Sequence, residues 1–250
     1  MDNGLNKKKV INDLNQSIAW EYNLVYFPMC YFISNRFSPY VSYYCMKYKK
    51  TPNQITGYMI LSGAIGGLLF ALPNILAKIV GMLLIQLWFV FDCSDGEVAR
   101  YQKKFSKFGS ELDFMAHLID HLVIIFGFFC SLYQLHLFSL TWLIAVVLIS
   151  LLGDALMRNL IVLEKYTLPA DSGNSQPKSE VKLDAVNIIK FFYNFGLFYP
   201  NFILFGVLIY FIDYFLHTPF LFALFIFNII CSVPIIFKKT VRLTKMYYQS

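Results

Sequence analysis

Long apolar blocks separated by short polar segments dominate the chain from residue 51 onward. Most of these blocks approach about twenty residues, the length of α-helix that crosses the hydrocarbon core of a bilayer. We therefore predict an all-α integral membrane protein with six transmembrane helices. The expected spans are Ile55–Leu76, Ile79–Phe91, Glu111–Tyr133, Leu137–Leu163, Ile188–Ile212 and Pro219–Phe237.

Residues 1–50 follow a different pattern. Residues 1–19 are polar and are expected to lack regular structure. From Trp20 to Lys50, aromatic residues are interleaved with basic ones, and Pro28 and Pro39 are expected to break the segment into short pieces. Aromatic rings at headgroup level and lysines near lipid phosphates are typical of helices that lie in the membrane interface. An interfacial amphipathic helix is therefore expected before the first span.

The chain thus divides into three predicted parts. Residues 1–50 form a cytosolic N-terminus and interfacial region, residues 51–240 form the six-helix membrane domain, and residues 241–250 form a cytosolic tail. The loop Tyr166–Glu180 is expected to connect the first four spans to the last two. Thr51 and Pro52 are expected to start the first membrane helix, as N-cap and first helical residue.

Composition supports membrane insertion. Only 14% of the residues are charged and 58% are hydrophobic, whereas a soluble domain carries about 25% charged residues. If both termini are inside, every Lys and Arg except Lys78 falls on the inner side. Because inner loops of membrane proteins are enriched in basic residues, we predict cytosolic termini and a cytosolic active site, in the plasma (inner) membrane. The net charge of +6 suits contact with anionic membrane lipids, and no nucleic acid partner is expected.

Acidic residues gather between the second and third predicted spans, where Asp92 and Asp95 end one apolar block and Asp113 opens the next. Acids at membrane depth are costly and usually have a function. Asp92 and Asp95 are three apart and share a helix face, as do Asp113, His117 and Asp120. Oxygen-rich sites favour Mg²⁺ or Mn²⁺, and two such ions can act on both sides of a displacement at phosphorus.

Small and basic residues beside these acids indicate a phosphate-containing ligand. Gly96 permits close approach of a ligand to the backbone, and Ala99 is small for the same reason. Arg100 presents a planar fork that suits phosphate oxygens. The alternative is a seam of charges that only joins two helices.

This segment carries a recognisable signature. Its residues resemble the motif DxxDGxxARx8GxxxDxxxD of the CDP-alcohol phosphotransferase (CDP-alcohol phosphatidyltransferase) family at every fixed position but the last. The matching residues are Asp92, Asp95, Gly96, Ala99, Arg100, Gly109 and Asp113. The preceding TPNQIT, residues 51–56, also resembles the segment that opens the first span in many members. The resemblance covers residues 30–165 well, and the last two spans by hydropathy alone.

The resemblance implies six transmembrane helices, usually a homodimer, and a polar cavity open to the cytosol. It also implies transfer of a phosphoryl-alcohol or phosphatidyl group from a CDP-linked donor to an acceptor hydroxyl, with release of CMP. The donor would be CDP-diacylglycerol or another CDP-alcohol, and the acceptor a lipid or an alcohol. Such a reaction belongs to phospholipid or membrane-glycan head-group synthesis.

Residue roles follow from the same resemblance. Two divalent cations, Mg²⁺ or Mn²⁺, would be held by Asp92, Asp95 and Asp113. The nucleotide would be bound by Asn53, Thr56, Asp92, Gly96, Ala99, Arg100 and Gly109.

The last motif position departs from the family, because His117 stands where the family has aspartate. That aspartate is usually assigned as general base with a share in metal binding, so His117 is expected to fill both roles. An imidazole, with an unperturbed pKa of about 6.5, is a better base than a carboxylate at about 3.9, but it brings one negative charge less. Asp120 could orient His117 or restore that charge. A displaced base at Asp120 or His121, and loss of activity, are the alternatives.

Asp154 and Arg158 are four apart in the fourth span, the spacing of an intrahelical ion pair. Arg158 either stabilises the helix through this pair or receives the phosphate of a lipid or phosphorylated acceptor. Two other functions stay open for the whole chain. One is a catalytically silent scaffold that binds a CDP-lipid, and the other is an ion transporter, which would place its acids near mid-bilayer.

Overall fold

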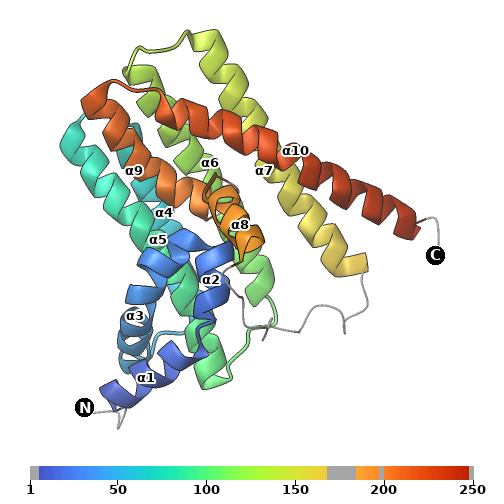
Figure 1. Ribbon diagram of the computed structural model, residues 1–250. Coiled ribbons are helices and arrows are strands. Elements are labelled where there is room, and N and C mark those ends of the chain that lie inside the picture. Colours follow the sequence, from blue (N-terminus) through green and yellow to red (C-terminus); the bar gives the residue numbers. More distant parts are fainter. Residues whose placement is uncertain (1–5, 168–183, 197–199, 248–250) are drawn as a thin grey trace.

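The computed structural model in Figure 1 describes residues 6–167, 184–196 and 200–247, and every regular element in these ranges is a helix. The predicted all-α fold is therefore confirmed. The helices are α1 (Lys7–Ser17), α2 (Trp20–Tyr26), the π-helical turn η1 (Cys30–Ser34), α3 (Asn35–Lys47), α4 (Pro52–Ala71), α5 (Ile75–Gln102), α6 (Gly109–Gln134), α7 (Leu140–Thr167), α8 (Ala185–Gly196), α9 (Asn201–Leu216) and α10 (Phe220–Tyr247).

Five of these helices are long and apolar enough to cross a membrane, namely α4, α5, α6, α7 and α10. The predicted fifth span, Ile188–Ile212, falls instead on two helices, α8 and α9. Pro200 stands at the N-cap of α9 and cannot continue a preceding helix without losing a backbone hydrogen bond. The apolar α9 has 16 residues and is about 24 Å long, shorter than a typical hydrocarbon core. A sixth crossing stays a prediction.

Helix α4 begins as predicted. The Thr51 side chain accepts a hydrogen bond from the Gln54 backbone, and the Gln54 side chain accepts one from the Thr51 backbone, with Pro52 in the first turn. This capping box satisfies two backbone donors that a helix start otherwise leaves without partners. It also sets where α4 starts, and therefore where Asn53 and Thr56 lie.

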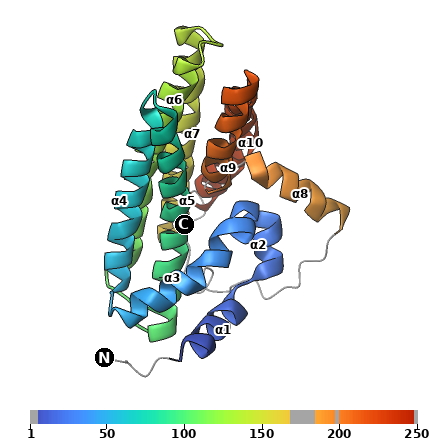
Figure 2. The same cartoon turned by 90° about the vertical axis from the view of Figure 1, so that its left-hand side faces the viewer.

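Helix α4 lies beside both α5 and α6 (Figures 1 and 2). Small residues let them approach closely, because a Cβ added at Gly66 would lie 2.9 Å from a side-chain carbon of Ile85. One added at Gly67 would lie 2.9 Å from the backbone of Val123. The small residues of α4 thus form a packing surface.

Helix α5 is longer than the second span predicted from hydropathy. It runs without interruption to Gln102, so Asp92 and Asp95 share one rigid element. Lys103, with φ of 52°, ends it in the left-handed region, and α6 begins at Gly109. This short connection brings the acidic ends of α5 and α6 together.

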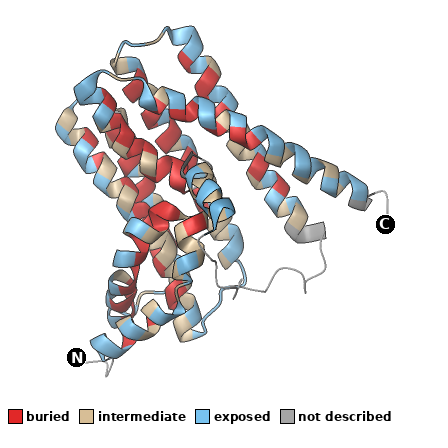
Figure 3. Cartoon of the chain, in the orientation of Figure 1, coloured by how far each residue is buried: buried red, intermediate tan, exposed pale blue. Residues whose placement is uncertain are grey.

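Buried residues concentrate where α4, α5, α6 and α9 meet, as Figure 3 shows. Trp88, Phe70 and Phe128 are fully buried there. Lys78, the basic residue assigned to the outer side from sequence, is also buried. Its Nζ donates to the Phe70 carbonyl at 2.7 Å and to the Ser131 hydroxyl at 2.6 Å, which satisfies the ammonium inside the bundle.

The N-terminal region differs from expectation in two respects. Residues 7–17 form the helix α1, whereas we expected no regular structure, because Val10 and Leu14 bury one face of α1 against Tyr43 of α3. Pro39 lies inside α3 and does not break it. The predicted loop Tyr166–Glu180 falls, from residue 168, outside the described residues.

Candidate active site

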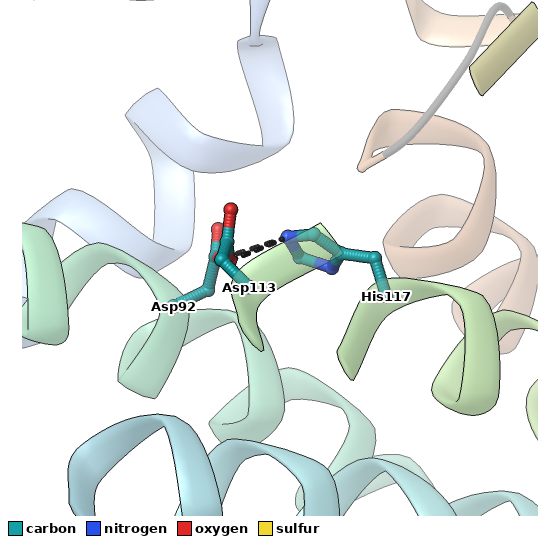
Figure 4. Close-up of side chains that lie close together, drawn as sticks. All are labelled: Asp92, Asp113 and His117. Atoms are coloured by element: carbon teal, nitrogen blue, oxygen red, sulfur yellow. Dashed lines mark ion pairs between the residues drawn. The ribbon is translucent and has the colours of Figure 1, made fainter. Parts of the chain in front are cut away.

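The C-terminal half of α5 and the first turns of α6 bring Asp92, Asp113 and His117 together (Figure 4). His117 Nε2 lies 3.1 Å from Asp92 Oδ1 and 3.2 Å from Asp113 Oδ1. The imidazole is buried, whereas 45% of the Asp113 side chain is exposed, so the cluster borders an accessible surface. His117, the residue at the divergent position, therefore meets one carboxylate from its own helix and one from α5.

These three side chains fit a divalent cation. One ligand atom from each lies within 4.8 Å of the others, which is close enough for a single ion to contact all three. Two carboxylate oxygens and one imidazole nitrogen suit Mn²⁺ or Mg²⁺, whereas structural zinc sites are rich in thiolates. The convergence of two carboxylates also provides the negative charge that such an ion needs.

Asp95 lies outside this three-residue cluster. Its Oδ2 accepts a short hydrogen bond, 2.6 Å, from the Thr56 hydroxyl of α4. Asp95 and Asp113 line the same cavity, so Asp95 faces the same space as the cluster without contacting it directly. Thr56, proposed from sequence as a nucleotide contact, therefore also holds an acid of the motif.

A cavity of about 400 Å³ opens beside the cluster. Every residue predicted to bind the nucleotide, except Asp92, lines this cavity. Two cations, Arg100 and Lys104, and several hydroxyl and amide groups lie in its wall. The lining residues are Pro52, Asn53, Thr56, Asp95, Gly96, Ala99, Arg100, Lys104, Phe105, Ser106, Gly109, Ser110 and Asp113.

Gly96 makes room for a side chain of its own helix. A Cβ at this position would lie only 2.8 Å from Nη1 of Arg100. The absence of a side chain thus leaves space for the Arg100 guanidinium beside Gly96 at the cavity wall. Sequence reasoning assigned this space to the ligand, and the structure gives part of it to Arg100.

Asp120 contacts Trp88 across the α5–α6 interface. Its Oδ2 accepts a hydrogen bond of 2.8 Å from the indole Nε1, and the residue is fully buried. The Trp88 ring in turn lies edge-on to the His117 ring, with centroids 6.0 Å apart. Asp120 is thus placed to hold the tryptophan that packs beside His117.

The predicted pair of Asp154 and Arg158 is present in α7 and includes His121 of α6. Asp154 Oδ2 lies 3.0 Å from Arg158 Nε and 3.0 Å from His121 Nδ1. Arg158 Nη2 is also 2.8 Å from His121 Nε2. His121 is therefore engaged with α7.

Two groups of residues were not predicted from the sequence. Glu97 is buried between α5 and α3, where it accepts hydrogen bonds of 2.6 Å from both Ser38 and Ser42. Lys104, Phe105, Ser106 and Ser110 complete the cavity wall. The only signal for the latter group is its position around the motif glycine, since the motif leaves these positions free.

The fold and the site together define an all-α membrane protein with an acidic cluster beside a polar, partly basic cavity. The sequence model described as CDP-alcohol phosphatidyltransferase matches residues 49–233, and the chain belongs to this family. No curated protein matches it. Members are membrane-bound transferases that use CDP-alcohol donors and alcohol acceptors in phospholipid synthesis, and they generally depend on a divalent metal. The chain is thus a multi-pass membrane protein of a transferase family.

Proposed function

We propose that this protein transfers a phosphoryl-alcohol or phosphatidyl group from a CDP-linked donor to the hydroxyl of a lipid or alcohol acceptor and releases CMP. The single observation that carries this proposal is the convergence of Asp92, Asp113 and His117 beside a cavity that contains Arg100. The cavity, at about 400 Å³, falls within the size range of ligand pockets.

The cavity wall would bind the donor. Arg100 and Lys104 offer cationic groups to the diphosphate, and the Arg100 fork can contact two oxygens of one phosphate. Asn53 and Thr56 reach the same cavity from α4, where their polar groups suit the ribose or the base. Ala99 and Gly109 leave the wall open where bulkier side chains would fill it.

The acids would hold the cation. Asp92, Asp113 and His117 are the proposed ligands of Mg²⁺ or Mn²⁺, and Asp95, in the adjoining cavity, is the proposed ligand of a second ion. A bound cation would supply positive charge to the phosphate oxygens as negative charge develops there.

His117 is the proposed general base. Because Nε2 has a single lone pair, it would leave the cation to Asp92 and Asp113 in this step and take the proton of the acceptor hydroxyl, whose oxygen forms a bond to the β-phosphorus of the donor. The bond from that phosphorus to the oxygen bridging the two phosphates breaks, and CMP leaves with the electron pair. The carboxylates of Asp92 and Asp113, each within 3.2 Å of Nε2, would stabilise the imidazolium formed. Asp120 is better suited to position Trp88 than to act as the base, since its carboxylate is buried against the indole.

Arg158 is the proposed contact for a phosphate on the acceptor. Asp154 and His121 hold its guanidinium in a defined position on α7. An acceptor phosphate would share this group, because a guanidinium carries five N–H donors.

We further propose that the site and both termini face the cytosol, in the plasma (inner) membrane, and that the protein acts as a homodimer. The start of α1 and the α5–α6 connection both lie in the lower part of Figure 1, consistent with a shared side. The proposed parts are residues 1–50, 51–240 and 241–250, although α10 continues through Lys245 into the last of these.

The test is CMP release by the purified full chain, incubated with Mg²⁺, a panel of CDP-linked donors and candidate acceptor lipids and alcohols. Release that requires both the cation and an acceptor is expected. Binding of a CDP-linked donor without turnover would instead identify a scaffold. Cation flux into vesicles with no nucleotide binding would identify a transporter.

A further inference from the structure

An aromatic side chain stands in the wall of an otherwise polar cavity. Phe105, in the connection between α5 and α6, lines the cavity and is 74% exposed. Among the described residues that line this cavity, it is the one aromatic residue. Burying an exposed phenyl ring is favourable, so a ligand that covers the ring would gain this free energy.

The residues on both sides of Phe105 are anchored. The Lys104 N–H donates to the Ala99 carbonyl at 3.0 Å, which closes the end of α5. The Ser106 hydroxyl accepts from the Asn53 side chain at 3.2 Å and from the Phe108 N–H at 3.4 Å. Phe105 is thus held at the cavity between two tethered residues.

The remaining described lining of the cavity suits the phosphates and the sugar of a nucleotide, but offers no other aromatic ring. A pyrimidine base has a π-face that stacks on aromatic side chains, and such stacking contributes markedly to nucleotide binding. We propose that the ring of Phe105 stacks on the cytosine base of the donor. This inference rests on the proposed function, because it concerns the nucleotide of the same reaction.

Phe108 provides a matched control within the same connection. It is 65% exposed, similar to Phe105, but it is not among the residues that line the cavity. If exposed aromatic rings here only anchored the connection in the membrane interface, both would matter equally. Stacking on a base requires Phe105 alone.

The experiment measures binding of CMP and of ribose 5-phosphate, which lacks the base, to the full chain in lipid nanodiscs with Mg²⁺. Phe105→Ala is expected to weaken CMP binding about tenfold, within the range of base–aromatic stacking. Phe105→Leu keeps apolar bulk without a π-face and should weaken CMP binding similarly, whereas Phe105→Trp should retain it. Phe108→Ala should bind CMP as the unaltered chain does. Ribose 5-phosphate binding should be the same in all variants.

Equal CMP affinity in Phe105→Ala and the unaltered chain would overturn the inference and leave the proposed function standing. A parallel loss of CMP and ribose 5-phosphate binding would also overturn it, since the residue would then act through the shape of the connection. If the unaltered chain binds no CMP and releases none from any CDP-linked donor, the proposed function itself fails.

Discussion

The indole N–H of Trp88 donates a 2.8 Å hydrogen bond to Oδ2 of Asp120, joining α5 to α6 inside the bundle. Both residues are fully buried, and Asp120 is packed so closely against α4 that a Cβ at Gly63 would lie 2.7 Å from its carboxyl carbon. The Trp88 ring lies beside His117. A motif position occupied by histidine is thus supported by a tryptophan–aspartate pair that no motif describes.

Replacing Trp88 tests this support. Trp88→Phe keeps an aromatic ring but removes the donor, so the buried carboxylate of Asp120 loses its hydrogen bond. We expect a loss of stability of about 1–3 kcal/mol, read as a lower melting temperature of the detergent-solubilised protein. Trp142→Phe is the control, because Trp142 is 67% exposed on α7. Equal melting temperatures for the two variants would show that the indole bond contributes nothing.

Removing a proposed metal ligand should weaken metal binding without preventing the protein from folding. Asp113→Asn keeps the size of the side chain but removes its charge, so we expect weaker binding of Mn²⁺ and a fall in CMP release of roughly 100-fold or more. Asp92→Asn should behave in the same way. Glu111→Gln, on the same helix as Asp113 but outside the cavity lining, should have little effect. Full activity of Asp113→Asn would refute the assignment of the metal site.

The divergent motif position can be tested by two substitutions. His117→Ala removes the proposed base and should reduce CMP release by roughly 10²–10⁴-fold. His117→Asp, which installs the residue usual for the family, should recover part of the activity. Initial rates at saturating donor, with melting temperature as a folding check, provide the measurement. An active His117→Ala protein would transfer the role to Asp120.

The close packing of α4 predicts opposite effects for two glycines of one helix. Gly67→Ala would push a Cβ to 2.9 Å from the backbone of Val123 on α6, so the helices must separate. We expect a destabilisation of about 1–3 kcal/mol. Gly57→Ala meets nothing within 4 Å and should be neutral or slightly stabilising, since alanine favours helix. A Gly67→Ala protein as stable as Gly57→Ala would contradict the packing.

Local patterns along the chain determined much of this protein. Hydropathy predicted the helical membrane fold, because block length alone distinguishes a spanning helix. The spacing of Asp92 and Asp95, and that of Asp113 and His117, predicted that each pair shares a helix face, because helical periodicity places residues three or four apart on one face. The start of α4 followed from Thr51 and Pro52, because the preferences for the N-cap and the first helical position depend only on neighbouring residues.

Tertiary structure alone decided contacts between distant segments. Glu97 meets Ser38 and Ser42, and Trp88 meets Asp120, because of how each helix is rotated against its neighbour. Hydropathy also predicted a single span over Ile188–Ile212, because an apolar stretch has the same hydropathy whether or not a turn interrupts it. A periodic pattern specifies the face of a helix, but not which other helix covers that face. That choice depends on the packing of the whole bundle.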